Sequence, residues 1–345
     1  MELKEITLTP LLDTLRLEKI SDDIYFSEKY SGYVSNSRLG LLNPRQQGSP
    51  EQFFEGFKSG GFSSSLMLGS AIHELTLQPE YFELADDTKK PTAKLGMMAD
   101  ELYPIYVERK ITYDDIVKAS DKVDYYKGKL NKEKALNVIN SSMEYWKNRQ
   151  MNEFKLETSK ETIYLDYKSL EITKSCVESL AKNYQVQKLL NPGEDIISEN
   201  EQAILLNVEA KCPNGKTFII RLKSKLDNYT IDVSNNTIVV NDVKTIGRMV
   251  SEIDSNIVRF HYSREFAMYM YLLKLCSEKF YNMSSPKMQA NYLVVSTVPN
   301  FYSKVRPVTY QELMDGFHEF KTLLKYVAYL IGYKNYSFDK PKFNL

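Results

Sequence analysis

The chain has 345 residues and no net charge, because 45 lysines and arginines balance 45 aspartates and glutamates. Its apolar fraction of 43% is ordinary for a globular protein, and the sequence contains no run of about 18 apolar residues that would predict a membrane-spanning helix. The charge balance excludes a strongly basic protein that coats nucleic acid, so any surface that contacts DNA or RNA must be local.

The three cysteines, Cys176, Cys212 and Cys276, lie far apart in the sequence. Their number and spacing fit neither a disulfide framework nor a four-cysteine iron–sulfur cluster. The N-terminal residues also lack the pattern of a signal peptide. We therefore expect a cytoplasmic protein that does not associate with a membrane.

The first part of the chain predicts helices and turns. Residues 1–60 are expected to be irregular, with short helical pieces, and residues 61–190 to be mostly helical. The serines that follow Gly60-Gly61 favour the start of a helix that covers about 64–77. The breaker sequence Asn191-Pro192-Gly193 then predicts the end of the helical part.

The rest of the chain, about 195–335, predicts β-hairpins followed by a helix, a strand and a helix. The expected strands cover about 200–209, 217–227, 229–233, 237–244 and 288–297. The expected helices cover about 263–277 and 309–331. This order predicts a mixed α/β (α+β) fold, in which a core sheet is flanked by helices, and a single domain over 1–345 with a helical N-terminal part.

Two acidic residues, Asp227 and Asp242, stand near the ends of neighbouring predicted strands. Side chains alternate between the two faces of a strand, so Asp227 shares a face with Arg221, Lys223 and Lys225. The opposite face of this strand is largely apolar and is expected to pack inward. The sequence thus predicts a basic face that ends in a carboxylate.

A tight turn at Asn235-Asn236 would bring the two acids close together, because asparagine tolerates the positive φ values of hairpin turns. The pairing register stays open. Neighbouring carboxylates raise each other's pKa unless a cation neutralises them, and oxygen ligands favour Mg²⁺ or Mn²⁺. Lys244 lies two residues after Asp242 on the same face. The same spacing in Asp166 and Lys168 indicates a solvated charged pair, and this alternative stays open for Asp242 and Lys244.

One of the three histidines, His73, lies in the predicted helix at 64–77. It stands between Ile72 and Leu75, which are expected to face the core. His73 is therefore either a partly buried structural histidine or a metal ligand, with Gly69 allowing close approach of the backbone.

Several segments between residues 35 and 270 resemble, in order, the motifs of one nuclease family. They read SNSRL at 35–39, SPEQF at 49–53, LGSAIHEL at 68–75, KSKLD at 223–227, DVKT at 242–245 and EFAMY at 265–269. They are similar to the family's serine-leucine and Ser-Pro entry motif, Gly-x-x-x-His helix, Lys-Gly-Arg-Pro-Asp strand, Asp-x-Lys-Thr and Gln-x-x-x-Tyr. The chain thus resembles PD-(D/E)XK nucleases of the phage and prophage exodeoxyribonuclease VIII type, in the RecB-like branch.

The resemblance implies a metal centre and a catalytic lysine. His73, Asp227 and Asp242 would be ligands of Mg²⁺ or Mn²⁺, together with the backbone carbonyl of Val243. Lys244 would orient or activate the attacking water and stabilise charge on the phosphate.

The family also has a glutamate on the preceding strand. Glu201 and Glu199 are both candidates, and we favour Glu201 because it lies closer to the apolar run that follows.

The resemblance also implies contacts with DNA. The predicted basic face of Arg221, Lys223 and Lys225 is the candidate surface, and the resemblance adds Glu265 and Tyr269. Glu265 departs from the family's glutamine and would repel phosphate unless it pairs with a cation such as Arg264 or binds metal.

The implied function is a metal-dependent exonuclease that degrades duplex DNA from its ends in the 5′-to-3′ direction. The expected partners are duplex ends, a single-strand annealing protein and further copies of the chain, in phage-type recombination in a bacterial host's cytoplasm. Two alternatives remain: a structure-specific or single-strand endonuclease on the same fold, and a non-catalytic DNA-binding or scaffolding protein.

Overall fold

The computed structural model describes residues 3–56, 64–86, 90–126, 128–155 and 160–338. Contacts between residues divide the chain into two compact units. Unit 1 comprises Met1–Gly60 and Cys176–Leu345, and unit 2 comprises Gly61–Ser175. Each unit is described by itself, and the single domain expected over 1–345 stays a prediction.

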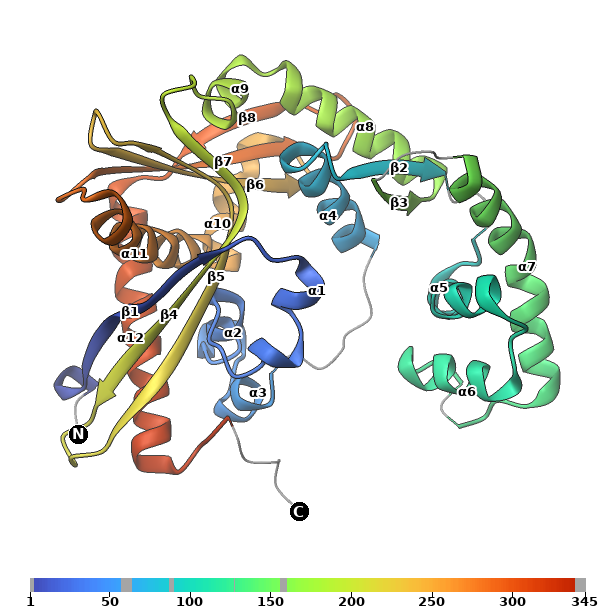
Figure 1. Cartoon of the computed structure of the whole chain (residues 1–345), viewed down its shortest axis with the longest axis horizontal. Coiled ribbons are helices and arrows are strands. Elements are labelled where there is room, and N and C mark those ends of the chain that lie inside the picture. The colour runs from blue at the N-terminus through green and yellow to red at the C-terminus, as the bar shows by residue number, and fades with distance from the viewer. Residues whose placement is uncertain (1–2, 57–63, 87–89, 127, 156–159, 339–345) are drawn as a thin grey trace. The chain divides into compact units, whose positions relative to one another are not determined.

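Unit 1 is built on a six-stranded sheet with the order β1-β4-β5-β6-β7-β8. Its strands are β1 (Thr7–Glu18), β4 (Ile197–Lys211), β5 (Thr217–Asp232), β6 (Thr237–Ile246), β7 (Lys287–Ser296) and β8 (Ser303–Pro307). Neighbouring strands are antiparallel except β6 and β7, which are parallel. The chain needs a long crossover to reach a parallel neighbour, and helices provide it. The expected mixed α/β sheet flanked by helices is confirmed (Figure 1).

The crossover from β6 to β7 contains η4 (Val250–Glu252), α10 (Ile253–Phe260) and α11 (Tyr262–Tyr281), and α12 (Tyr310–Lys334) follows β8. The apolar core of unit 1 joins the sheet to α11 and α12 through residues such as Leu222, Val240, Leu272 and Leu324. The remaining helices of this unit are η1 (Leu3–Glu5), α1 (Asp22–Tyr25), η2 (Glu28–Tyr30), α2 (Asn36–Gly40), η3 (Pro44–Gln46), α3 (Pro50–Glu55) and α9 (Tyr184–Leu190).

Unit 2 consists of helices and one parallel strand pair. Its elements are α4 (Ser64–Leu77), β2 (Phe82–Asp86), α5 (Ala93–Glu108), α6 (Tyr113–Lys122), α7 (Lys132–Lys155) and β3 (Glu161–Leu165), and α8 (Tyr167–Lys182) begins here and ends in unit 1. An apolar cluster joins α5, α6 and α7 around Trp146, whose indole N–H donates to the carbonyl of Ala99 at 2.8 Å. The predicted helix at 64–77 is confirmed by α4, whereas Gly60-Gly61 and Ser63 lie outside the described residues.

The hairpin prediction is confirmed, but the break expected at residue 228 is wrong. β5 runs without interruption from Thr217 to Asp232, because Asn228 is buried and pairs with both neighbouring strands. The chain then turns between Asp232 and Thr237, where Asn236 adopts a φ of 48°. Asparagine tolerates this left-handed conformation better than other non-glycine residues.

Several strands were missed by the sequence analysis. β1 lies in the segment expected to be irregular, and β2 and β3 lie in the part expected to be helical. β1 contains Pro10 and a register shift between Leu11 and Arg16, and both features mask the alternation of a strand. Proline is tolerated here because β1 is an edge strand.

Within the described ranges, no helix is long and apolar enough to cross a membrane. The three cysteines, which all lie in the described ranges, are buried and unpaired.

Candidate metal centre

The register of the sheet aligns three acidic residues in one row, which we call the acid row: Glu201 on β4, Asp227 on β5 and Asp242 on β6. Regular β4–β5 pairing on both sides places Glu201 opposite Asp227. The β5–β6 ladder ends at the pair of Asn228 and Asn241, so Asp227 and Asp242 stand at the next step. The two acids therefore lie where β5 and β6 part.

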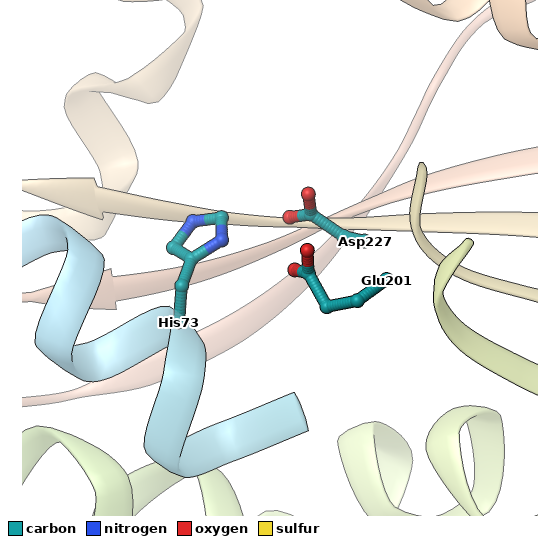
Figure 2. Close-up of side chains that lie close together, drawn as sticks. All are labelled: His73, Glu201 and Asp227. Atoms are coloured by element: carbon teal, nitrogen blue, oxygen red, sulfur yellow. The ribbon is translucent and has the colours of Figure 1, made fainter. Parts of the chain in front are cut away.

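The carboxylates of Glu201 and Asp227 lie next to each other (Figure 2), and one oxygen of each lies within 4.8 Å of the other. Glu201 has a φ of 52°, a left-handed conformation in the middle of a strand. Such a conformation costs about 1–2 kcal/mol, and conformations of this kind concentrate at functional sites. The alternative glutamate, Glu199, lies 3.7 Å from Lys19 instead. The structure thus brings Glu201 to Asp227.

Asp242 is buried, and neither of its oxygens accepts an aligned hydrogen bond from the described residues. Its nearest cation is Lys244, whose Nζ lies 2.6 Å from Oδ2. Asp227 is held by the backbone N–H of Val243, which donates to Oδ2 at 2.8 Å. The N–H and C=O of one strand residue point toward the same neighbouring strand, so the Val243 carbonyl is also directed toward β5.

The electrostatics of the acid row fit a divalent cation. Burial and the charge of Glu201 raise the pKa of Asp227 to about 8, although Lys244 and the Val243 amide oppose the shift. Burial and the charge of Asp227 raise the pKa of Asp242 well above its usual range. A bound divalent ion would remove both effects, since it supplies positive charge that the oxygens of Asp227 and Asp242 could coordinate. Oxygen donors of this kind suit Mg²⁺ or Mn²⁺.

Lys244 is the cation beside Asp242, and its ammonium has two carboxylate neighbours and one aromatic neighbour among the described residues. Besides Asp242, its Nζ donates to Glu265 at 3.0 Å and lies 4.7 Å from the centre of the Tyr262 ring. Burial alone would lower the pKa of Lys244, but the carboxylates around it, Asp242 first, raise that pKa well above its usual value. Lys244 therefore stays an ammonium ion.

Glu265 thus pairs with Lys244 and not with Arg264, the residue that precedes it in the sequence. Arg264 is buried and donates instead to Glu319 at 2.7 Å and to Asn36 at 2.8 Å. Glu319 also contacts His261 at 2.9 Å. Glu265 is thus paired with a cation, which is Lys244 and not the suggested Arg264, because consecutive residues of α11 point in different directions.

Removing the Arg264 guanidinium is expected to destabilise unit 1 strongly. Arg264→Met would leave the half-buried carboxylate of Glu319, whose side chain is 25% exposed, without its main partner. The expected cost is about 3 kcal/mol, the lower end of the range for a broken buried pair. Urea denaturation measures this change in the free energy of unfolding. The double variant Arg264→Met/Glu319→Met should recover a large part of the loss, and an unchanged urea midpoint in Arg264→Met would contradict the prediction.

The predicted basic face divides into buried and exposed cations. Lys223 is buried, donates to the carbonyl of Tyr25 at 2.6 Å, and has a pKa lowered to about 8 by burial. Lys225 lies 2.8 Å from Glu201 and 2.5 Å from Asp22. Only Arg221 of this set is exposed to solvent.

Arg221 borders a surface hollow of about 310 Å³ beside β1. The hollow is also lined by Arg16, Tyr33 and Asn207, and the Arg221 guanidinium lies 6.0 Å from the centre of the Tyr33 ring. Two arginines beside an aromatic ring can contact a phosphate and an adjacent base, although Asp13 also lines the hollow.

Tyr269 and His73 complete the predicted set. Tyr269 is buried on α11, and burial together with the charge of Glu265 raises the pKa of its hydroxyl well above the usual value. His73, the imidazole labelled in Figure 2, lies on α4 of unit 2, and its neighbour Ile72 is buried. The role of His73 as a ligand stays a prediction from the sequence.

The sequence analysis missed four asparagines beside the acid row. Asn200, Asn228, Asn241 and Asn291 stand at paired positions on β4, β5, β6 and β7. The signal was present as the dipeptides Asn-Glu, Asp-Asn and Asn-Asp, one on each acidic strand.

No family model matches the chain, and no curated protein matches it significantly. Among solved structures, the chain is similar to a protein from Eubacterium rectale described as a "Putative exonuclease". The two chains share 11% sequence identity with a TM-score of 0.44, over 94% of this chain and 97% of the other. The function proposed below therefore rests on the residues of this chain.

Proposed function

We propose that this protein is a metal-dependent nuclease that hydrolyses phosphodiester bonds in DNA. The observation that carries the proposal is the acid row beside Lys244. Two of its carboxylates have raised pKa values, and the Lys244 ammonium lies 2.6 Å from Asp242. In the described part of the chain, no group donates an aligned hydrogen bond to Asp242. A site of this kind binds a divalent cation and places it beside a second positive charge, which suits a phosphate substrate.

Glu201, Asp227, Asp242 and the carbonyl of Val243 would hold the ion. His73 is proposed as a further ligand on the basis of the sequence resemblance. When bound, a divalent ion supplies a Lewis acid that polarises phosphate oxygens and makes water more acidic.

The chain's own groups perform the remaining tasks. Lys244 carries a fixed positive charge, which orients the attacking water and stabilises the negative charge that develops on the phosphate. Glu265 holds the Lys244 ammonium through the 3.0 Å hydrogen bond. The Val243 amide fixes the direction of the Asp227 carboxylate.

We propose further that the enzyme is an exonuclease that acts on duplex ends in the 5′-to-3′ direction. The proposed partners, a single-strand annealing protein and further copies of this chain, follow from the same family resemblance, as does the role in phage-type recombination or DNA processing.

The test uses purified full-length protein with linear and circular duplex DNA, and with Mg²⁺ or Mn²⁺. We expect degradation of linear DNA only, and loss of this activity in Lys244→Ala and Asp242→Ala. Lys168→Ala is the matched control, because Lys168 belongs to an exposed pair with the same spacing. End-labelled substrates report the direction of degradation.

Other outcomes distinguish the alternatives. Cutting of circular DNA would indicate an endonuclease on the same fold. Binding without cleavage in wild type and in both variants would indicate a DNA-binding or scaffolding protein, and the catalytic proposal would be wrong.

Arg221 and Lys223 give a separate prediction on DNA binding. Arg221→Ala is expected to weaken DNA affinity and to lower the slope of log Kd against log salt concentration by about 1, because it removes one phosphate contact. Lys223→Ala should leave both quantities unchanged, since Lys223 is buried. Fluorescence anisotropy in a salt series measures both. If the two variants weakened DNA binding equally, the exposure of Arg221 would not explain its effect, and the prediction would be wrong.

A further inference from the structure

Four asparagine side chains form a continuous hydrogen-bonded chain across the sheet, which we call the asparagine ladder. Asn291 Nδ2 donates to Asn241 Oδ1 at 3.0 Å, Asn241 Nδ2 to Asn228 Oδ1 at 2.7 Å, and Asn228 Nδ2 to Asn200 Oδ1 at 2.7 Å. The ladder thus links β7, β6, β5 and β4. Three of its members, Asn228, Asn241 and Asn291, are buried.

Three members of the ladder stand next to the three acids of the acid row. Asn200 precedes Glu201, Asn228 follows Asp227, and Asn241 precedes Asp242. On β5 and β6, adjacent residues point to opposite faces, so Asn228 and Asn241 lie on the face opposite Asp227 and Asp242. On β4, Asn200 bonds to Asn228 whereas Glu201 lies beside Asp227, so the same division holds there. Each carboxylate is therefore separated from a rung of the ladder by a single step of backbone.

The position of the ladder matters because the main-chain pairing between β5 and β6 ends there. Asn228 and Asn241 form the last pair of the β5–β6 ladder before the strands part. Just beyond it, Glu201, Asp227 and Asp242 repel one another when ionised, which tends to spread the three strands. The side-chain amides add one hydrogen bond between each pair of strands at the row where this repulsion acts.

We infer that the asparagine ladder positions the carboxylates of the acid row for metal binding, by fixing the separation of β4, β5 and β6. The four asparagines are positioning residues, because they act through the backbone and lie on the face away from the ion. This inference rests on the proposed function, since it concerns the same metal centre.

Neutral amides suit this task better than other side chains. An amide donates and accepts at once, so it passes hydrogen bonds from strand to strand without adding charge next to the acids. An apolar side chain would remove the bond between strands and leave the neighbouring buried amides unpaired. An aspartate would add a further negative charge to the three already present.

The test measures Mn²⁺ affinity by calorimetry on the purified full chain without DNA. Asn241→Leu is expected to weaken Mn²⁺ binding about 10-fold or more, in the range found when groups that orient metal ligands are removed. Thr230→Val is the matched control, because Thr230 is buried on β5, two residues from Asn228 and on the same face. This control should keep its affinity within about twofold of wild type.

Two further variants keep the test decisive. Asn200→Ala, at the half-buried end of the ladder, should show a smaller loss in the same direction and replaces Asn241→Leu if the latter does not fold. Asp242→Ala should abolish binding and so verifies the metal centre. Wild-type affinity in the folded asparagine variants, with binding lost in Asp242→Ala, would overturn the inference and leave the proposed function standing. Unchanged binding in Asp242→Ala would overturn both.

Discussion

Lys244→Met is expected to lower kcat for DNA hydrolysis by about 10²–10³-fold, the usual effect of removing one group that stabilises developing negative charge. The Kd for DNA should change little, because Lys244 is largely buried and already paired with Asp242 and Glu265. Single-turnover kinetics at saturating DNA and Mg²⁺ separate the chemical step from binding.

This substitution also removes the cation that faces two carboxylates, so the metal-free variant should be less stable than wild type. The double variant Lys244→Met/Glu265→Gln controls for this effect, since it removes one of the uncompensated charges. We expect the double variant to regain stability and to stay inactive. Recovery of activity in the double variant would show that Lys244 serves folding rather than catalysis.

The main features of the centre could be predicted from local patterns. The period of two along a strand placed Asp242 and Lys244 on one face, and Asn235-Asn236 predicted the hairpin that brings Asp227 to Asp242. These inferences hold because they depend on backbone geometry over short distances. The choice of Glu201 over Glu199 followed from its position beside the apolar run of β4, and the structure places Glu201 opposite Asp227.

Features that depend on distant segments could not be predicted in this way. Lys223 belongs to the face expected to be basic and exposed, but the Tyr25 carbonyl accepts its ammonium and the Tyr25 ring lies 4.2 Å away. These two residues are separated by 198 positions in the sequence. The sequence likewise left the partner of Glu265 open, with Arg264 as one suggestion, whereas the geometry of the helix directs Glu265 to Lys244 on β6.

The asparagine ladder could not be predicted from the sequence either, because it also depends on distant segments. Each asparagine alone is typical of a turn, and the expected strands left out Asn228. The role of the four asparagines depends on the pairing register of four strands, and this register is a property of the whole sheet. Pairing of identical residues across strands becomes visible only when the strands are aligned.

Mg²⁺ should stabilise the protein more at pH 8.5 than at pH 6. In the metal-free protein, burial and the charge of Glu201 raise the pKa of Asp227 to about 8, above the value of about 3.9 for an unfolded chain. The folded state therefore binds more protons than the unfolded state between these values. The contribution of Asp227 to stability is fully present below about pH 4 and is lost as pH rises through about 8.

The ion reverses this loss, because it binds the ionised carboxylates of the folded state. At pH 6 it must first displace protons, whereas at pH 8.5 it need not, so its apparent affinity rises with pH up to about 8. At a Mg²⁺ concentration about 100 times the Kd, the expected stabilisation is about 2.7 kcal/mol. Thermal unfolding with Mg²⁺ or with EDTA, at both pH values, measures the difference in Tm.

Asp227→Asn should remove the effect, since the amide neither ionises in this range nor provides a charged ligand. The metal-free form of this variant should be more stable than wild type at pH 8.5, because the repulsion from Glu201 and Asp242 is lost. Asp232→Asn is the matched control on β5, five residues along the same strand, and should keep the wild-type response. An equal Mg²⁺-induced shift in Tm at both pH values, or an unchanged response in Asp227→Asn, would place the ion outside the acid row.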